Sequence, residues 1–282
     1  MQEDRSSTNS QSKYAVALSL DKFRSMSKNL TEGENVSIGV LAAFLEGIIL
    51  QPTLFWKNAK AQHIPFTMNP RVIYRGTAAS LYNEMQMMGL QFGLTGLFQR
   101  FNGLGEYGAA MMGGAAAATF ASPVELVMIQ QQKFGGSVIN TSRRVVSEFG
   151  VQGIFRGLAP AMMRDALYVS GFLGITPLSQ NYLMNEHGMS AVESGFWASM
   201  LGGVAAAVPS HPLDLVKTCM QGDLQRETYR SMNQSFQVLW KQGRVRRLFS
   251  GCFWRSFNII ATVYIANECR VRFPPLIYGK EA

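Results

Sequence analysis

Charged residues are scarce in this chain of 282 residues, because Asp, Glu, Lys and Arg together make up 16% of it, against about 25% in an ordinary soluble domain. That shortage counts against a solvated globular enzyme. Cysteine is scarce too, and three residues are too few for a disulfide-stapled secreted scaffold. Glycine has no collagen-like period, and 18 Phe and 16 Met exclude a disordered chain. The composition therefore implies a large apolar volume.

Three stretches contain no charged residue, and their lengths of 18, 20 and 20 residues approach the roughly 20 that a helix needs to cross the hydrocarbon core. They are residues 107–124, 166–185 and 194–213. Three stretches with one charge each alternate with them, at residues 35–56, 77–99 and 252–267. A soluble protein with buried helices is the alternative, but uncharged runs rich in Gly and Ala are typical of helices packed in membranes. The sequence predicts an all-α membrane protein with six transmembrane helices.

The basic residues fall mainly on one side of these predicted spans. Segments 57–75, 133–156 and 217–255 hold 16 of the 26 Lys and Arg residues, whereas links 100–106 and 186–193 hold one between them. The positive-inside rule then places the three basic segments in the inner compartment and both chain ends outside. The positive charges that fix the membrane orientation thus explain the net charge of +8, and nucleic-acid binding is not predicted. The cluster Arg244, Arg246 and Arg247 indicates anionic lipid headgroups or a solvated surface.

A threefold repeat organises the spans. Each copy has two small residues shortly before a proline and closes with an aromatic residue, a variable residue and a glycine. The prolines are Pro52, Pro123 and Pro212, and the closing glycines are Gly76, Gly157 and Gly251. Proline removes a helical hydrogen bond, so we expect the odd-numbered helices to kink at these positions.

The repeat also predicts domain boundaries. We expect a polar tail at residues 1–34, repeats at 35–105, 106–190 and 191–273, and a C-terminal tail at 274–282. The first repeat is degenerate, with 24 residues from proline to closing glycine against 34 and 39 in the other two.

The repeated pattern is a proline, an acid two positions later, a base five positions later, and the aromatic–x–glycine ending. It resembles the mitochondrial carrier family, most closely in the third copy, Pro212-Leu213-Asp214-Leu215-Val216-Lys217, and the resemblance covers roughly residues 36–272. It implies six helices in three pseudo-symmetric two-helix repeats around a central cavity. It further implies transport by alternating access, with no enzymatic activity and no cofactor.

The resemblance also implies an inner gate of ion pairs, in which the acid of each odd helix pairs with the base of the next. The expected pairs are Glu125–Lys217 and Asp214–Lys57. Leu54 stands where the first acid would be, and Met128 stands where the second base would be, so both departures fall on one apolar gate pair. Losing one partner of a buried pair costs about 3–5 kcal/mol, whereas replacing both can be neutral. The alternative is independent decay of a degenerate carrier.

The outer gate of such carriers is only weakly represented. Residues 91–100 and 173–183 lack the pattern of an aromatic, an acidic and a basic residue. A loose match to this pattern is formed by Tyr264, Glu268 and Arg272. We therefore expect the outer closed state to depend on packing and neutral hydrogen bonds, and the resting state to favour opening outward.

Polar and charged residues inside a span are costly and are candidates for function. The resemblance places substrate contacts on the even helices at a fixed offset from the closing glycine, and Glu46 adds an asymmetric charge. The candidates are Glu46, Asn83, Glu84, Met87, Arg164, Asp165, Tyr168, Asn258 and Thr262. Arg164 is the strongest candidate, because a guanidinium binds a carboxylate through two parallel hydrogen bonds. An arginine followed by an acid at this position also resembles the pattern in carriers of amino acids. A structural Arg164–Asp165 or Arg164–Glu84 pair is the alternative.

The predicted function is transport of a small carboxylate-bearing metabolite, an amino acid or a keto or dicarboxylic acid, across the mitochondrial inner membrane. A carrier-derived adaptor or morphology protein without transport activity is the alternative, and a pore is a third option. We expect a multi-pass monomer with both termini on the intermembrane side and anionic lipid such as cardiolipin at the inner loops. No metal site is expected, because Cys219, Cys252 and Cys269 share no ligand spacing.

Overall fold

The computed structural model of the protein describes residues 32–98 and 105–279, so most of the predicted N-terminal tail and the last three residues lie outside the described part. The described residues form helices and connecting loops, without strands. The helices are α2 (Glu32–Ile49), α3 (Gln51–Ala61), α4 (Pro70–Ile73), α5 (Thr77–Phe98), α6 (Gly105–Phe134), α7 (Val138–Ile154), α8 (Leu158–His187), α9 (Ala191–Gly222), α10 (Met232–Leu248) and α11 (Cys252–Phe273), followed by a short π-helix at Pro274–Tyr278.

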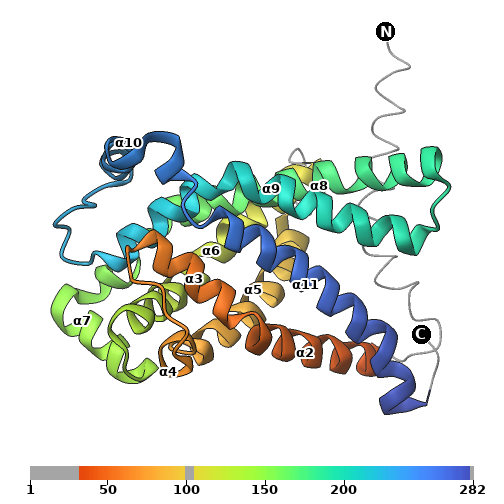
Figure 1. Ribbon diagram of the computed structural model, residues 1–282, viewed down its shortest axis with the longest axis horizontal. Coiled ribbons are helices and arrows are strands. Elements are labelled where there is room, and N and C mark those ends of the chain that lie inside the picture. Colours follow the sequence, from red (N-terminus) through yellow and green to blue (C-terminus); the bar gives the residue numbers. More distant parts are fainter. Residues whose placement is uncertain (1–31, 99–104, 280–282) are drawn as a thin grey trace, which may run out of the picture.

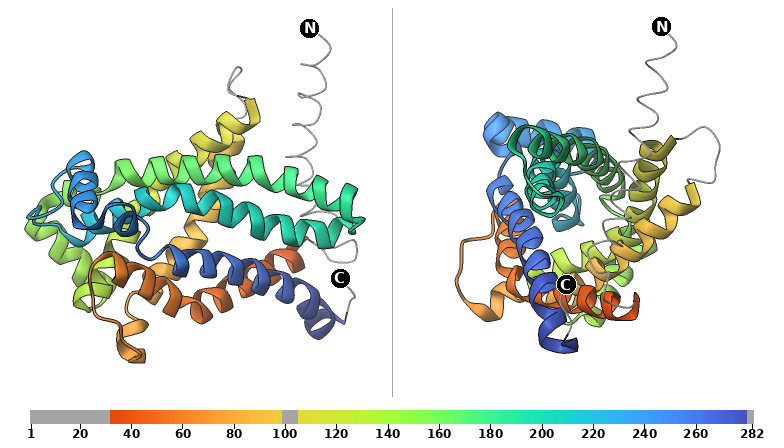
Figure 2. Two further views of the ribbon diagram at one scale, coloured as in Figure 1. Left: turned by 45° about the horizontal axis from the view of Figure 1, so that its top comes forward. Right: turned by 90° about the vertical axis from the view of Figure 1, so that its right-hand side faces the viewer.

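The long helices close into a ring (Figure 1). Each packs against its neighbours in the order α2–α3, α5, α6, α8, α9 and α11, and α11 returns to α2 and α3. The view along the long axis in Figure 2 shows the helices arranged around a common centre. A ring of this kind gives every long helix one face toward the interior, where polar side chains from all three repeats can meet.

The long helices extend beyond the uncharged stretches that predicted them. The stretch 166–185 lies inside α8, which begins at Leu158 and therefore contains the charged pair Arg164 and Asp165. Helix α2 begins at Glu32, within the predicted tail, whereas α9 begins at Ala191, the predicted start of the third repeat. The three uncharged runs are therefore shorter than α6, α8 and α9, because charged residues near the ends of these runs do not interrupt the helices.

Apolar character alone identifies fewer spans than the ring contains. Among the described residues, Gly108–Phe134 and Ala191–Gly222 are long and apolar enough to cross a membrane, and Ser37–Ile49 with Gln51–Ala61 becomes a third if the bent pair is one span. Helices α5, α8 and α11 do not meet this criterion. They carry the candidates Glu84 and Arg164 and the charged residue Arg255, and such side chains lower the mean hydropathy.

The three repeat prolines lie in different surroundings. Pro52 is at the start of α3, which is bent by 50° from α2 across Leu50. Pro123 and Pro212 lie inside α6 and α9, which continue through them as single helices. The expected kink is therefore seen as a 50° bend in the first repeat, while a kink at Pro123 and Pro212 stays a prediction.

The small residues before the prolines bring neighbouring helices close together. A Cβ atom added to Gly114 would lie 3.0 Å from Val169 of α8, and one added to Gly203 would lie 2.8 Å from Ile259 of α11. Close approach of this kind is how membrane helices gain packing energy where the hydrophobic effect is absent.

The helix between the two long helical segments of each repeat lies at the same end of the ring, where Figure 1 shows α4, α7 and α10. Each begins with a side-chain cap: Asn69, Ser137 and Ser231 accept hydrogen bonds from the backbone of Arg71, Asn140 and Gln234. Helices α7 and α10 have 17 residues each and α4 has four. The shorter loop of the first repeat therefore loses most of its helix but keeps the cap that starts it.

Candidate functional site

Two buried ion pairs join the odd helices near their C-terminal ends. Lys57 Nζ of α3 lies 2.9 Å from Asp214 Oδ2 of α9, and Lys217 Nζ of α9 lies 2.7 Å from Glu125 Oε2 of α6. Asp214 and Lys217 are each 2% exposed. The two pairs bring together the residues that sequence spacing had selected, and they connect α3 to α9 and α9 to α6.

The third interface between odd helices is apolar. Leu54 of α3 packs against the cluster of Met128, Ile129 and Ala79. One turn further along, Asn58 Nδ2 donates a hydrogen bond of 2.8 Å to Gln132 Oε1. The α3–α6 interface thus contains an apolar cluster that includes Leu54 and Met128, and a neutral amide bond, where the other two interfaces contain ions. Sequence reasoning did not anticipate the amide bond.

Arg164 lies between the ion pairs and the interior of the ring. Its guanidinium binds Asp165 through two bonds, from Nε at 2.7 Å and from Nη2 at 2.8 Å. Its Nη1 donates to Glu125 Oε1 and to Asp214 Oδ1, both at 3.1 Å. One side chain of α8 therefore contacts the acids of both ion pairs. Of the two structural pairs considered as alternatives, the one with Asp165 is present, and Glu84 is not among the ion partners of Arg164.

Arg255 of α11 is a further cation at this level. Its Nη2 donates to Ser210 Oγ at 3.0 Å, and its Nη1 lies 4.0 Å from Asp214 Oδ2. The guanidinium also lies 5.8 Å from the ring centre of the candidate Tyr168, within the range of a cation–π contact. Asp214 is thus surrounded by cations from α3, α8, α9 and α11.

The candidates of α11 bind residues of the first repeat. Thr262 Oγ1 donates to Glu46 Oε1, and Asn258 Nδ2 donates to Thr53 Oγ1 at 2.8 Å. Both contacts lie between α11 and the α2–α3 pair, so these candidates are brought together across the boundary between the third and first repeats.

The candidates of α5 make fewer contacts with other polar groups. Asn83 is buried with no hydrogen-bond partner for its Oδ1, Met87 is half-buried and Glu84 is exposed. Glu84 lies within electrostatic reach of Glu46, Glu125, Arg164 and Lys57. Its carboxylate therefore belongs to the interior charges of the ring without being paired to one of them.

The closing glycines contact the gate positions, a relationship that sequence reasoning missed. All three have positive φ, at 82° for Gly76, 81° for Gly157 and 92° for Gly251. A Cβ atom at each would lie 3.1–3.3 Å from a backbone oxygen of the next repeat: Met128, Lys217 and Lys57, respectively. The signal was present as a constant glycine at the end of each inner loop, but the partner across the interface could not be deduced from it.

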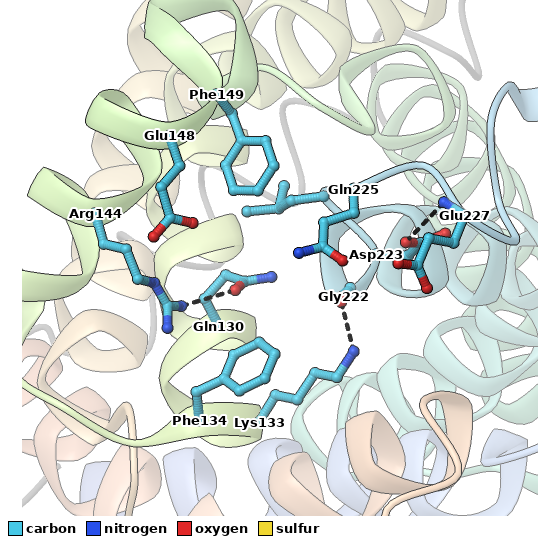
Figure 3. Close-up of a pocket in the computed structure, with 11 residues that line it drawn as sticks. Gln130, Lys133, Phe134, Arg144, Glu148, Phe149, Gly222, Asp223, Gln225 and Glu227 are labelled. Atoms are coloured by element: carbon cyan, nitrogen blue, oxygen red, sulfur yellow. Dashed lines mark hydrogen bonds between the residues drawn. The ribbon is translucent and has the colours of Figure 1, made fainter.

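A cavity of about 330 Å³ opens at the inner end between the α6–α7 and α9–α10 connections (Figure 3). It is lined by Gln130, Lys133, Phe134, Arg144, Glu148, Phe149, Gly222, Asp223, Leu224, Gln225 and Glu227. Lys133 Nζ donates to the carbonyl of Gly222 at 2.7 Å, and Arg144 donates to Gln130 Oε1 at 3.0 Å. Both cations are thus bound to the protein's own oxygens.

Asp223 organises the loop that borders this cavity. Its carboxylate accepts hydrogen bonds from the backbone amides of Glu227, Thr228 and Tyr229 at 3.2, 2.9 and 2.8 Å. Partial burial opposes ionisation, but the three amides and the nearby Arg156 outweigh it, so the pKa of Asp223 lies below its usual value.

The inner basic cluster is not a uniform surface. Arg244 and Arg246 are exposed, but Arg247 is buried and bonded to α3. The expectation that all three face headgroups or solvent is therefore wrong for Arg247, because its guanidinium satisfies carbonyl groups at a helix end.

Two of the three residues predicted as a loose outer-gate pattern form an ion pair near the C-terminal end of α11. Arg272 Nε lies 2.7 Å from Glu268 Oε2, one turn away on the same helix. This pair lies within α11 and does not connect it to a neighbouring helix, whereas the inner ion pairs connect different repeats.

Comparison with known proteins agrees with this arrangement. The family described as "Mitochondrial carrier protein" matches residues 99–187 and 190–266, which cover the second and third repeats. The chain is 30% identical over 188 residues to the solute carrier family 25 protein Shawn of Drosophila melanogaster, covering 61% of this chain and 46% of that protein.

Two further relatives have named substrates. The mitochondrial 2-oxoglutarate/malate carrier protein of Bos taurus is 28% identical over 208 residues, covering 67% of this chain and 66% of that protein. The mitochondrial arginine transporter BAC2 of Arabidopsis thaliana is 26% identical over 224 residues, covering 72% and 74%. The chain thus spans about half the length of some relatives and about two thirds or more of others. With the threefold repeat and the six-helix ring, these matches show that the chain belongs to the mitochondrial carrier family.

Proposed function

We propose that this protein carries a small carboxylate-bearing metabolite across the mitochondrial inner membrane by alternating access, with no covalent chemistry. The observation that carries the proposal is the position of Arg164. Its guanidinium contacts Asp165 and both gate acids, Glu125 and Asp214. A substrate carboxylate that binds Arg164 would compete with these acids, so substrate binding and gate stability are linked through one side chain.

The charges inside the ring favour an amino acid within this class. None of the ion pairs among the described residues includes Glu46 or Glu84. Unpaired carboxylates within a span are costly, and an ammonium or guanidinium group of a substrate would offset that cost. Arg164 would bind the carboxylate of the same molecule. A keto or dicarboxylic acid would use Arg164 equally well but would leave Glu46 and Glu84 without a cationic partner.

Transport requires the inner end to open. In the described state the ion pairs Lys57–Asp214 and Lys217–Glu125 are formed, and in the proposed cycle this state is the one with the inner gate closed. A substrate that binds more tightly to the state with the gate weakened shifts the population toward opening, and release on the inner side re-forms the pairs. The proposed orientation places both chain ends on the intermembrane side and α4, α7 and α10 on the matrix side, where their exposed basic residues, such as Arg244 and Arg246, face anionic lipid.

A binding screen on the detergent-purified protein tests the site. Amino acids, keto acids, dicarboxylates and nucleotides are compared by thermal unfolding of the wild type, Arg164→Ala and the exposed control Arg246→Ala. A ligand at one hundred times its Kd stabilises the folded state by about 2.7 kcal/mol. We expect a shift from amino acids that persists in Arg246→Ala and is lost in Arg164→Ala. A shift that is equal in Arg164→Ala would overturn the assignment of Arg164.

A second function is favoured by the first repeat. The Leu54–Met128 contact replaces one ion pair, and α4 is only four residues long, as expected for a carrier-derived adaptor that no longer transports. That alternative predicts cooperative unfolding of the purified protein with no ligand-dependent shift across the whole panel.

A further inference from the structure

The second repeat reaches across to the third through Arg156. This arginine immediately precedes the closing Gly157, and its Nε donates to the carbonyls of Met220 at 2.7 Å and Asp223 at 2.9 Å. Its Nη2 also donates to the carbonyl of Tyr229. The last carbonyls of a helix have no partner within the helix, and a cation there also offsets the negative end of the helix dipole. Arg156 thus binds the C-terminal end of α9, the helix that carries Lys217.

The third repeat reaches the first in the same way but with a different residue. Ser250 immediately precedes the closing Gly251, so the position of Arg156 is occupied by a short neutral side chain. Arg247, three residues earlier, donates from Nη1 to the carbonyl of Lys60 at 3.1 Å and from Nη2 to that of Ala61 at 2.6 Å. These are the last carbonyls of α3, the helix that carries Lys57.

The carbonyls bound by the two arginines occupy equivalent places. Lys60 lies three residues after the gate base Lys57, and Met220 lies three residues after the gate base Lys217. Both arginines are 8% exposed. In the first repeat, Arg75 precedes Gly76, and its guanidinium lies 3.6 Å from the Cβ position of Gly135, just beyond the end of α6. An arginine of each inner loop therefore lies at the end of the next repeat's odd helix.

We propose that Arg247 is a positioning residue of the inner gate. Arg156 of the second repeat binds the end of the next odd helix, and Arg247 has this role in the third repeat, because Ser250, at the position equivalent to Arg156, is too short and neutral. The planar fork of Arg247 binds two carbonyls at once, so the inner loop of the third repeat and the end of α3 move as one body. The bond fixes the axial position of α3 and thereby places Lys57 opposite Asp214. The inference rests on the proposed inner gate, but it does not depend on which substrate is carried.

The chain contains its own reporter for this contact. Cys219 Sγ donates to the carbonyl of Ala61 at 3.3 Å, the same oxygen that Arg247 Nη2 binds. Cys219 is 2% exposed and packs in one cluster with Ala61 of α3 and Leu239 of α10, so a thiol reagent reaches it only when an element packed on it moves away, and loss of the bond to Ala61 frees the α3 side. The other two cysteines, Cys252 and Cys269, are replaced by alanine so that labelling reports Cys219 alone.

The experiment compares labelling of Cys219 by a membrane-impermeant maleimide in inside-out vesicles that contain the full chain. We expect Arg247→Ala to increase the labelling rate by roughly tenfold, the factor that about 1.4 kcal/mol represents. The exposed neighbour Arg246→Ala is the matched control and should label like the parent. The relocation variant Arg247→Ala/Ser250→Arg should return the rate toward the parent value, because an arginine at residue 250 has the place that Arg156 has in the second repeat.

The relocation variant separates a positioning role from a general effect on stability. If Arg247 only supported folding, an arginine at residue 250 would not restore the labelling rate. If Arg247→Ala does not fold, Arg247→Lys serves instead, because one ammonium group cannot hold two carbonyls as the guanidinium does, and its labelling should rise less. Equal labelling of the parent and the Arg247 variant, or no recovery in the relocation variant, would overturn the proposal. Labelling needs no substrate, so a protein that transports nothing would still report this contact.

Discussion

Single side chains at the inner end each connect several elements. Arg164 contacts acids on α6, α8 and α9, and Asp214 faces cations from four helices. Buried charges are tolerable only when they are paired and hydrogen-bonded. A substitution at either residue therefore leaves several partners uncompensated, and its effect should exceed that of losing one ion pair.

Glycine 157 provides a test of close packing at the residue scale. Its φ of 81° is strained for any other residue, and a Cβ atom would lie 3.1 Å from Gln221 and 3.3 Å from the Lys217 carbonyl. We expect Gly157→Ala to destabilise the protein by about 1–3 kcal/mol, measured by thermal unfolding in detergent. Gly174→Ala, on α8 with open space around it, is the matched control and should be neutral or slightly stabilising. Equal behaviour of the two variants would refute the packing argument.

Asp223 makes stability depend on pH at the residue scale. Its folded-state pKa is lowered, so the charged carboxylate contributes stability above its unfolded pKa of about 3.9, and this contribution is lost as the pH falls through the folded value. We expect Asp223→Asn to cost up to about 1 kcal/mol at pH 7, since the side chain is partly exposed and solvent screens its charge. The difference in unfolding midpoint between wild type and variant should persist down to about pH 4 and shrink below it. A difference that grows on acidification would contradict the role of the carboxylate.

The elements of the first repeat differ most from those of the other two. Helices α2 and α3 are separate where α6 and α9 are continuous, α4 is short, and the α3–α6 interface is apolar. The ring nevertheless closes in the same order, because the closing Gly76 contacts Met128 in the way that Gly157 contacts Lys217. The lost charges thus leave the packing of the repeat in place.

The apolar contact between α3 and α6 can be converted back to an ion pair. Leu54→Asp or Met128→Lys alone places an unpaired charge in the cluster and should cost about 3–5 kcal/mol. The double variant should recover much of that loss, because the two charges are then placed to pair across the interface. Unfolding midpoints of the four proteins give a double-mutant cycle. Strictly additive losses would show that residues 54 and 128 do not face each other.

The repeated proline and its spacing to charged residues in long apolar runs predicted the elements and selected the charged residues, and the resemblance to mitochondrial carriers implied how those residues pair. Sequence spacing could not predict Arg247, since Ser250 breaks the pattern at the expected position and one arginine of a basic run looks like any other. Nor could it predict the Asn58–Gln132 bond, because that bond joins residues of different repeats that share no common spacing. The Arg247 and Asn58–Gln132 contacts both cross from one repeat to the next.

At the scale of the whole molecule, the three repeats are linked in a cycle. The second repeat contacts the third through Glu125–Lys217 and Arg156, and the third contacts the first through Asp214–Lys57 and Arg247. The first contacts the second through Leu54–Met128 and Gly76. In a closed cycle, separation at one interface strains the others, so the inner gate should open at all three interfaces together.

The measurement that tests this account most directly is transport with the inner gate locked. Leu54→Cys and Met128→Cys are introduced into a chain whose native cysteines are replaced, and the protein is reconstituted in liposomes and cross-linked by oxidation or a short bifunctional reagent. Neither substitution removes a gate charge. We expect amino acid uptake by the reduced protein, loss of uptake in proportion to cross-linking, recovery after reduction of the disulfide, and no effect of oxidation on either single-cysteine variant. Full uptake by the fully cross-linked protein, or no uptake of any amino, keto or dicarboxylic acid by the reduced protein, would contradict alternating access through this gate.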